Sequence, residues 1–388
     1  MILTEYFPDI LEPVFTGGVE SRVFHLVKHL MEKNTVDVIK RTDIYSFNSP
    51  IAIIHRGMFF LHQLIKIIFI STKYDIVEGT NFVTYILAFL YAKKIGAKAV
   101  AWYPDVFIGQ GVERLGLLSG IATEFTERLA IKLPWDGIIA LSEETKKKLI
   151  LRGTNPGKPK VIYGGVENQK YKKVQESTHL RQATEGQARK YKEVTILCIA
   201  RLVKYKRTQD LLLAIYFLHR RYRDIRVIIV GNGPMKNYLI KLSRQLGTYE
   251  RISWMNGVSE NQKWELLTRS HIHVLPSVVE GFGLVTVESL ASGTPVVNAD
   301  IPINREILEK EEVRRKKEEG NIEEGLVQGG LLFKAGDAVD LAEKIETLLV
   351  NRKLYNQKVS EAYELVRKYD WEKVNRQTEE FYQHLLSN

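Results

Sequence analysis

Two carboxylates and two glycines stand together in the stretch PSVVEGFGLVTVESLASGTPVVN, residues 276–298. Glu280 and Glu288 are eight residues apart, and Gly281 and Gly283 lie between them. Carboxylates accept hydrogen bonds from hydroxyl groups, and glycines allow a ligand to approach the main chain closely. This group of residues is suited to binding a ligand that carries both hydroxyl groups and negative charge.

The residues on either side predict a strand, a loop and a helix. The apolar run 271–275 ends at Pro276, and a helical segment that carries Glu288 follows the loop and ends at Gly293. The first N–H groups of such a helix have no intrahelical acceptors, and the helix dipole gives this end a partial positive charge. We therefore predict an anion site here, and a diphosphate is the anion that this geometry favours.

Two cations follow a second predicted strand. Arg201 and Lys206 lie five residues apart after the apolar run 194–200. A charge cluster in such a place is usually solvated surface. Taken alone, the two cations therefore do not indicate a function.

A further glycine pair follows the predicted strand 226–230, in the sequence Gly231-Asn-Gly233-Pro234. The pair resembles the start of a dinucleotide-binding fingerprint. Lys236 stands where the third glycine would be, so the evidence for NAD binding is weak. A nucleotide contact and a purely structural turn both remain open.

Length and composition indicate a globular protein of two domains. The chain has 388 residues, too many for one average core, and 45% of them are hydrophobic. Lys and Arg total 56 against 46 Asp and Glu, so the net charge of +10 favours anionic partners such as nucleotides, phospholipid surfaces or nucleic acid. The single cysteine, Cys198, is expected in the core, and one cysteine excludes an intramolecular disulfide.

Strands that alternate with helices predict a parallel sheet in each half of the chain. One of the strands predicted for the first half covers 52–55. Residues 168–192 contain almost no aliphatic side chains and are predicted to link the halves. The predicted domains are therefore 1–167 and 193–370, and the charged segment 308–324 is expected to form a solvated helical excursion.

No leader peptide and no membrane span are predicted. The first ten residues have no positive start and reach Glu5 and Pro8 too early for a signal peptide. The longest apolar stretch, 58–70, contains His62 and Lys66 and is too short to cross a bilayer. We therefore expect a cytoplasmic protein, either soluble or peripheral on the inner face of the membrane.

Two segments could contact an anionic membrane. The predicted helix 142–152 carries three lysines at 146–148 and Arg152 on one face, and the stretch 58–70 is apolar. An ordinary solvated helix and an ordinary buried helix explain the same two patterns, so both interpretations stay open.

The stretch from Glu280 to Glu288, with LPS before it and ASGTPVV after it, resembles the E-x7-E motif of the retaining glycosyltransferases of family 4. The resemblance implies an α/β protein with the GT-B fold, in which two Rossmann-like domains face a central cleft. The second domain would bind a nucleotide-sugar donor, and the first would bind the acceptor. The C-terminal helix, 371–388, would pack back on the first domain.

The resemblance also implies roles for single residues. Arg201 and Lys206 would bind the diphosphate and neutralise leaving-group charge, and Glu280 would hold sugar hydroxyls, so these three are the predicted catalytic residues. Glu288 would bind the ribose hydroxyls. The predicted donor-binding residues are Gly17, Gly18, Gly231, Gly233, Gly281, Phe282, Gly283, Leu284, Val285 and Glu288.

The first domain departs from the family pattern on the acceptor side. Pro104-Asp105 stands where many members have His-Asp, which leaves Asp105 as the predicted acceptor-side contact. Gly164-Gly165 stands where the family's NGVD segment begins, so a glycine replaces the asparagine. Neither change affects residues expected to bind donor phosphates.

The predicted reaction transfers a hexosyl group from a UDP-sugar or GDP-sugar to a hydroxyl of a glycan, a lipid or a small molecule, with retention of anomeric configuration. No metal and no cofactor are expected, because no Asp-x-Asp pair lies near the motifs and no Cys/His cluster has ligand spacing. A GT-B epimerase or hydrolase of nucleotide sugars is the main alternative. A nicotinamide-dependent dehydrogenase and a nucleic-acid-binding protein are less well supported.

Overall fold

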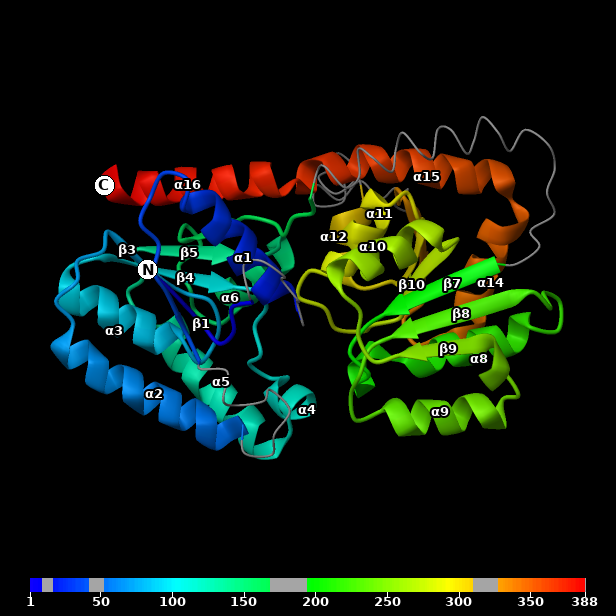
Figure 1. Ribbon diagram of the computed structural model, residues 1–388, viewed down its shortest axis with the longest axis horizontal. Coiled ribbons are helices and arrows are strands. Elements are labelled where there is room, and N and C mark those ends of the chain that lie inside the picture. Colours follow the sequence, from blue (N-terminus) through cyan, green and yellow to red (C-terminus); the bar gives the residue numbers. More distant parts are fainter. Residues whose placement is uncertain (9–16, 42–51, 168–193, 310–326, 388) are drawn as a thin grey trace. The chain divides into compact units, whose positions relative to one another are not determined.

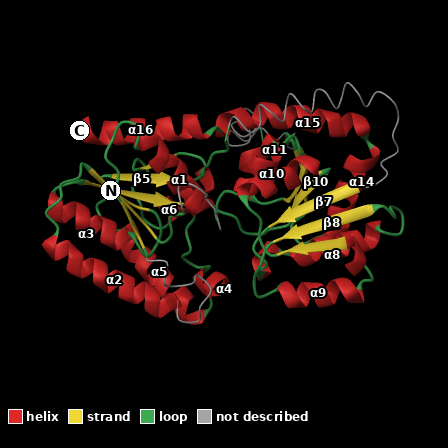
Figure 2. Ribbon diagram, viewed as in Figure 1, coloured by secondary structure: helices red, strands yellow, loops and turns green. Residues whose placement is uncertain are grey.

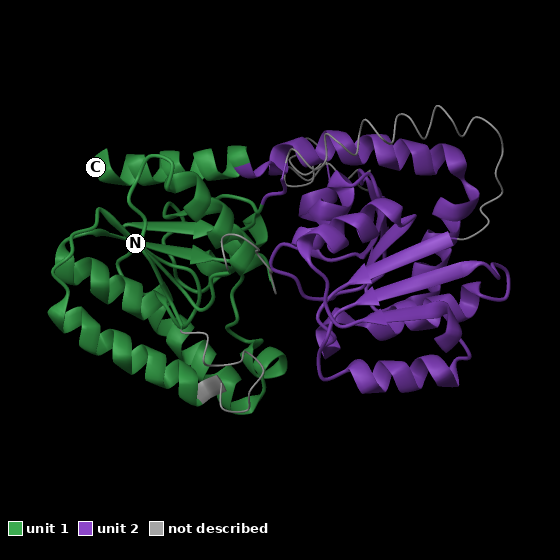
Figure 3. Ribbon diagram, in the orientation of Figure 1, with its two compact units in different colours: residues 1–164, 372–388 green, residues 165–371 purple. Residues whose placement is uncertain are grey.

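The chain forms two compact units, shown in Figure 3. The first unit contains residues 1–164 and 372–388, and the second contains residues 165–371. The computed structural model describes residues 1–8, 17–41, 52–167, 194–309 and 327–387 (Figure 1). The predicted linker, 168–192, and residues 310–324 of the charged segment lie outside the described residues.

The first unit is built on a six-stranded parallel sheet with the order β2-β1-β3-β4-β5-β6. Its strands are β1 (Ile2–Thr4), β2 (Val38–Lys40), β3 (Ile76–Gly79), β4 (Lys98–Tyr103), β5 (Gly137–Ala140) and β6 (Pro159–Val161). All six strands are short. Strands β4 and β5 are almost wholly apolar, as expected for strands covered on both faces. The strand order reverses between β1 and β3.

Helices cover this sheet, as Figure 2 shows. They are α1 (Gly18–Leu30), α2 (Ala52–Phe69), α3 (Tyr85–Ile95), α4 (Gly111–Leu115), α5 (Leu117–Ile131), α6 (Glu143–Leu151) and α16 (Trp371–Ser387). Helix α3 packs on β3 and β4 and also contacts α2 and α5, so these three helices form one layer. The core between this layer and the sheet includes Leu87, Ala88, Ala99 and Ala101.

The strand predicted at 52–55 is wrong, because these residues begin helix α2. A short run of apolar residues fits a strand and a buried helix equally well, and the packing of the whole segment makes the difference. Phe59 and Gln63 are buried one helical turn apart, and Phe60, Leu64 and Ile67 pack against the core of the unit. This spacing has the period of a helix rather than that of a strand.

The C-terminal helix α16 is tied to the first unit by a buried polar network. Arg22 on α1 forms an ion pair with Glu78 on β3, and the Tyr382 hydroxyl on α16 donates to the same carboxylate. The Arg22 guanidinium also lies 4.8 Å from the centroid of the Trp102 ring. The charge of Glu78 is therefore compensated in the interior, which a buried carboxylate requires.

The second unit contains another six-stranded parallel sheet, with the order β12-β11-β10-β7-β8-β9. Its strands are β7 (Val194–Ile199), β8 (Ile225–Val230), β9 (Ile252–Met255), β10 (Ile272–Leu275), β11 (Val296–Ala299) and β12 (Gly330–Phe333). The helices are η1 (Lys204–Lys206), α8 (Thr208–Leu218), α9 (Lys236–Gln245), η2 (Tyr249–Arg251), α10 (Glu260–Arg269), α11 (Leu284–Ala291), α12 (Pro302–Leu308), α14 (Ala338–Val350), α15 (Arg352–Val366) and η3 (Arg367–Tyr369). The predicted α/β class with two parallel sheets is confirmed.

Two further predictions can be compared with the structure. Cys198 is buried in β7 and unpaired, as predicted, and burial raises the pKa of its thiol to about 12. In the described part of the chain, none of the helices has the length and apolar character needed to cross a membrane.

Candidate functional site

The candidate site of the second unit lies where its strand order reverses. Strand β7 is followed in the chain by β8, its neighbour on one side. Strand β10, its neighbour on the other side, is followed by β11, which lies farther from β7. Loops at the carboxyl ends of two such strands diverge and leave room for a ligand between them. The loop after β7 carries Arg201 and Lys206, and the loop after β10 carries Glu280.

The structure brings two of the predicted catalytic residues into contact. Lys206 Nζ donates to Glu280 Oε1 at 2.5 Å, although the residues are 74 positions apart in the chain. Their side chains are only 13% and 9% exposed. The backbone supports this pairing, because the Val278 N–H donates to the Tyr205 carbonyl oxygen at 3.0 Å. One cation and one carboxylate are thus held at the carboxyl edge of the sheet.

Arg201 is exposed and contacts a residue that the sequence analysis did not select. Its Nη2 donates to the Tyr205 hydroxyl oxygen at 2.5 Å. Tyr205 is buried, and its ring centroid lies 5.8 Å from Lys206 Nζ. Tyr205 therefore connects the two predicted cations, and its position between them in the sequence was the only available signal.

The backbone after Lys206 is strained. Arg207 is the one described non-glycine residue with a positive φ, at 48°. Its guanidinium makes a bidentate ion pair with Asp210 in the first turn of α8, with Nε 2.6 Å from Oδ2 and Nη2 3.0 Å from Oδ1. Strain of this kind persists only where surrounding contacts compensate for it, and it is often found beside functional residues.

Gly231 and Gly233 allow two loops of this edge to touch. A Cβ on Gly231 would lie 1.9 Å from the Ala200 carbonyl oxygen, and a Cβ on Gly233 would lie 2.4 Å from the Leu202 carbonyl oxygen. The loops are joined by a hydrogen bond from the Leu202 N–H to the Asn232 carbonyl oxygen at 2.8 Å. The two glycines thus allow close packing against the loop that carries Arg201. A direct contact between these glycines and a donor stays a prediction.

Helix α11 begins beside Glu280, as the glycines there require. Gly283 is the N-cap residue, and its φ of 79° lies in the left-handed region that glycine adopts without strain. No side chain caps this helix start, and Gly283, Leu284 and Val285 are each partly exposed. The Thr286 N–H donates to the Gly283 carbonyl oxygen at 2.8 Å. The N–H groups of Leu284 and Val285 precede it and by helix geometry have no acceptor within the helix, which is the local feature that the predicted anion site requires.

Phe282 has a different role from its neighbours Gly281 and Gly283. Its side chain is buried, and its ring packs against that of Tyr369 with the centroids 5.5 Å apart and the planes at 71°. The side chain therefore anchors the loop to the protein interior. Any donor contact at this position would have to come from the main chain.

Glu288 is held by a lysine that the sequence analysis missed. Lys263 Nζ on α10 lies 2.7 Å from Glu288 Oε1 and also forms an ion pair with Glu260 at 2.8 Å. Burial disfavours the charge of Lys263, but the two carboxylates together raise its pKa. The carboxylate predicted to bind ribose is therefore oriented by a fixed cation. The signal was weak, because Lys263 is 25 positions away on an ordinary amphipathic helix.

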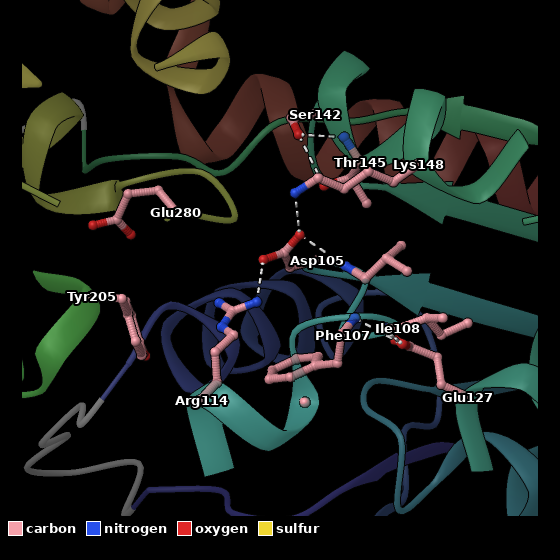
Figure 4. A network of polar contacts seen from close by, with 12 residues as sticks. Asp105, Phe107, Ile108, Arg114, Glu127, Ser142, Thr145, Lys148, Tyr205 and Glu280 are labelled. Carbon is pink, nitrogen blue, oxygen red and sulfur yellow. Dashed lines mark hydrogen bonds and ion pairs between the residues drawn. The ribbon is translucent and has the colours of Figure 1, made fainter. Parts of the chain in front are cut away.

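In the first unit, Asp105 lies in a closed polar network (Figure 4). Its Oδ2 accepts from Arg114 Nη1 at 2.7 Å, and its Oδ1 accepts from Lys148 Nζ at 2.9 Å and from the Val106 N–H at 2.8 Å. The Arg114 guanidinium stacks over the Phe107 ring, 4.4 Å from its centroid. Asp105 thus joins the loop after β4 to α4 and α6, and its predicted acceptor contact would be added to this structural role.

A second buried carboxyl group, Glu127 on α5, supports the same loop. Its Oε2 accepts from the N–H groups of Phe107 at 2.7 Å and Ile108 at 2.9 Å, as Figure 4 shows. Burial is the largest influence on this carboxyl group and raises its pKa from an ordinary 4.5 to about 8, although the hydrogen bonds from the two N–H groups lower the pKa. Glu127 was not selected from the sequence, where it is one acidic residue on an ordinary helix.

Two of the predicted basic residues near α6 contact the loop after β4. Lys148 pairs with Asp105, and Arg152 Nη2 donates to the Ile108 carbonyl oxygen at 3.1 Å. The α6 helix itself begins at a Ser142 N-cap whose hydroxyl accepts from the Thr145 N–H. The basic face of this helix therefore serves in part to hold the loop after β4.

Gly17 and Gly18, two of the predicted donor-binding residues, lie at the start of α1. Gly17 is the N-cap residue in an extended conformation, and a Cβ added to it would meet no atom within 4 Å. Gly18 is the first residue of the helix. Their contact with a donor remains a prediction.

The part of the chain that the structure describes contains no group of three or more His, Cys, Asp or Glu residues placed to hold a metal ion. The site of the second unit instead combines Arg201, Lys206, a helix start and two carboxylates. Such a site can bind a phosphate-bearing ligand that also carries hydroxyl groups.

Sequence comparisons associate the second unit with a known family. Residues 181–365 match the family described as Glycosyl transferases group 1. The phosphatidyl-myo-inositol mannosyltransferase of Mycobacterium leprae is 29% identical over 196 residues, which cover 50% of this chain and 47% of that protein. The gpi3 subunit of the phosphatidylinositol N-acetylglucosaminyltransferase of Schizosaccharomyces pombe is 22% identical over 410 residues, which cover 100% of this chain and 80% of that protein. The chain thus spans about half the length of the first relative.

Solved structures share the fold. HepE from Anabaena, in complex with UDP and glucose, has a TM-score of 0.70 and 18% identity, with 99% of both chains covered. Sucrose-phosphate synthase from Thermosynechococcus elongatus has a TM-score of 0.73 and 17% identity, with 100% of this chain and 98% of that chain covered. The fold is that of the GT-B class, with two Rossmann-like domains.

Proposed function

We propose that this protein is a retaining glycosyltransferase that moves a hexosyl group from a UDP-sugar or GDP-sugar to an acceptor hydroxyl. The observation that carries the proposal is the contact between Lys206 and Glu280 beside the uncapped start of α11. This arrangement lies within the residues that match the glycosyltransferase family. The relatives are named as a mannosyltransferase and an N-acetylglucosaminyltransferase subunit, which supports sugar transfer as the reaction class.

In the proposed reaction the second unit binds the donor. The diphosphate is stabilised by the N–H groups of Leu284 and Val285 at the start of α11 and by Arg201 and Lys206, which offset the charge that grows on the leaving group. Glu280 accepts hydrogen bonds from sugar hydroxyls, and Glu288, oriented by Lys263, accepts them from the ribose. Fixed cations supply the charge stabilisation that a metal ion supplies in other transferases, so we propose that no metal is required.

Retention follows if the acceptor attacks from the face that the phosphate leaves. The acceptor oxygen forms a bond to the anomeric carbon while the bond from that carbon to the phosphate oxygen breaks. The bonding electrons pass to the phosphate oxygen, and that oxygen takes the acceptor's proton. No side chain is then needed as a general base, which distinguishes this scheme from the paired carboxylates of a glycosidase.

For the acceptor we propose a hydroxyl on a lipid head group. Two relatives are named for phosphatidylinositol substrates, and this chain carries a net charge of +10, which favours an anionic acceptor. A glycan and a small molecule are the alternatives. A lipid acceptor would place the protein at the cytoplasmic face of a membrane.

The test is a set of incubations with UDP-glucose, UDP-N-acetylglucosamine and GDP-mannose, each with and without phosphatidylinositol. We expect nucleoside diphosphate release to depend on one donor and to rise when the acceptor lipid is present. The anomeric configuration of the product is read by NMR. Donor epimerisation or hydrolysis at an undiminished rate without acceptor would favour an epimerase or hydrolase instead, and an inverted product would contradict the proposed mechanism.

A further inference from the structure

Tyr205 is the buried residue of the loop that carries the two predicted cations. It is 5% exposed, whereas Arg201 is exposed and Lys206 is partly exposed. All three residues lie between the end of β7 and the start of α8, and the single 3-10 turn η1 contains two of them. Because its ring is packed in the interior, the Tyr205 side chain has a defined position, and so does its hydroxyl group.

This hydroxyl group anchors Arg201. Arg201 Nη2 donates to the Tyr205 hydroxyl oxygen at 2.5 Å. An exposed arginine side chain has many rotamers, and fixing it in one of them costs conformational entropy when a ligand binds. A guanidinium has several N–H groups in a planar fork, so the bond to Tyr205 leaves other donors for the oxygens of a phosphate.

The backbone of Tyr205 is fixed by both loops of the site. Its carbonyl oxygen accepts from the Val278 N–H, at 3.0 Å, in the loop that carries Glu280. Within its own loop, the Lys206 N–H donates to the Val203 carbonyl oxygen at 3.1 Å and closes the turn around Tyr205. The position of the hydroxyl group therefore depends on the loop after β7 and on the loop after β10 together.

We infer that Tyr205 is a positioning residue, which orients the Arg201 guanidinium for the donor diphosphate before the donor binds. The inference rests on the proposed donor site and adds a residue to it. Tyr205 acts through Arg201, because Tyr205 is buried and Arg201 reaches solvent. Preorganisation of this kind improves affinity, since less conformational freedom is lost on binding.

A purely structural role of the hydroxyl group is the other explanation. The hydroxyl group would then stabilise the folded loop, and its loss would lower the Tm without a specific effect on Arg201. The substitution Tyr205→Phe separates the two roles, because phenylalanine keeps the packed ring and its place 5.8 Å from Lys206 Nζ. The contribution of the hydroxyl group can therefore be measured by itself.

The first experiment measures the binding of UDP and of GDP by isothermal titration calorimetry. The proteins are wild type, Tyr205→Phe, Arg201→Gln and the double variant. We expect Tyr205→Phe to weaken nucleotide binding about fivefold, the effect of having to order one long side chain. Arg201→Gln should weaken it about tenfold or more, because a hydrogen bond to a charged group is lost. The double variant should bind no more weakly than Arg201→Gln, since the hydroxyl group acts only through the guanidinium.

Tyr222→Phe is the matched control for the loss of a tyrosine hydroxyl group. The Tyr222 hydroxyl donates to Glu346 Oε1 at 2.9 Å in the same unit. Tyr222 precedes β8 and so lies at the other end of the parallel sheet from the site. This variant should bind the nucleotide like wild type. Circular dichroism and thermal unfolding establish that every variant is folded.

The second experiment needs no ligand. NMR of ¹⁵N-labelled arginine side chains reports the order of each guanidinium, and the Arg201 signal is the one that is absent in Arg201→Gln. We expect the order parameter of the Arg201 Nε–H group to fall in Tyr205→Phe and to stay unchanged in Tyr222→Phe. A hydroxyl group that only stabilises the fold would not produce this local change.

Three results would overturn the inference. Tyr205→Phe would bind the nucleotide as tightly as wild type, the effects of Tyr205→Phe and Arg201→Gln would add in the double variant, or the Arg201 guanidinium would be equally ordered with and without the Tyr205 hydroxyl. A wild-type protein that binds neither UDP nor GDP would contradict the proposed function, and the NMR measurement then decides the role of Tyr205 separately.

Discussion

The two units use ion pairs at the carboxyl edges of similar sheets in different ways. In the first unit, Asp105 has both carboxylate oxygens occupied by Arg114, Lys148 and a backbone N–H, and its side chain is 5% exposed. In the second unit, Lys206 and Glu280 make one short contact beside a helix start that no side chain caps. A closed network of the first kind holds loops together, whereas an open pair of the second kind can add a ligand.

This difference shows that the sheet alone does not define a site. Both sheets reverse their strand order, at β1 and β3 in one and at β7 and β10 in the other. After β1, however, Glu5 is buried and pairs with Arg56 at 2.7 Å and with Arg41 at 3.6 Å. The loops and the helices behind them, rather than the sheet topology, determine how much charge is left available to a ligand.

The largest expected effect is on turnover. Replacing Lys206 with Ala should lower kcat at least about 100-fold, because a cation that stabilises the departing diphosphate is lost. Glu280→Gln should have an effect of similar size. Steady-state kinetics with the preferred donor measures both. The exposed neighbour Lys204 is the matched control, and Lys204→Ala should retain turnover. A near-normal kcat in Lys206→Ala would mean that the Lys206–Glu280 pair, like the Asp105 network of the first unit, only holds loops together.

The second effect is on the stability of the first unit. Asp105→Asn leaves Arg114 and Lys148 beside a neutral amide, and the loss of a buried partner should cost about 2–4 kcal/mol of unfolding free energy. Urea unfolding measures this cost, with the exposed Asp75→Asn as control. An unchanged stability together with a raised acceptor KM would show instead that Asp105 contacts the acceptor and does not hold the loop.

A smaller effect is expected on donor binding. Lys263→Met removes the cation that orients Glu288, so the donor KM should rise about tenfold, a change of about 1.4 kcal/mol, while kcat changes little. Lys263→Arg should recover most of the loss, because it restores the charge. Lys241→Met, an exposed lysine on α9, is the control. A fall in kcat with unchanged KM would argue against a role in ribose binding.

The last effect concerns the pH dependence of stability rather than activity. The pKa of Glu127 is about 8 in the folded protein and about 4.5 when unfolded, so its contribution to stability is full below the lower value and is lost as the pH rises toward the higher. The Tm of Glu127→Gln relative to the Tm of wild type should therefore increase as the pH rises between these two pKa values. Each kcal/mol of unfolding free energy corresponds to about 2–4 °C in Tm. Differential scanning calorimetry across this range measures it.

Glu124 offers a control for the pH prediction. Hydrogen bonds from the Gly109 and Gly111 backbone, the former the larger influence, lower the pKa of its carboxyl group. Its stabilising effect is then present above 4.5 and lost as the pH falls, so Glu124→Gln should show no growing advantage at higher pH. A parallel response of the two variants would mean that the Glu127 carboxyl is not held neutral by burial.

Much of the fold was readable from neighbouring residues. The alternation of apolar strands with helices predicted two parallel sheets, and the glycines at 281 and 283 predicted the loop and helix start beside Glu280. These features depend on short-range properties: side-chain periodicity, turn-forming residues and the φ angle that glycine tolerates. The burial of Cys198 followed from the apolar run around it for the same reason.

Other features depend on which strands and helices become neighbours, and local sequence carries no record of that. The ion pair between Lys206 and Glu280 requires β7 to lie beside β10. The ion pair between Lys263 and Glu288 requires α10 to lie beside α11. The run at 52–55 became helical because the whole of α2 packs on the first unit. Ion pairs and packing energies act between residues far apart in the chain, so folding in three dimensions is what selects them.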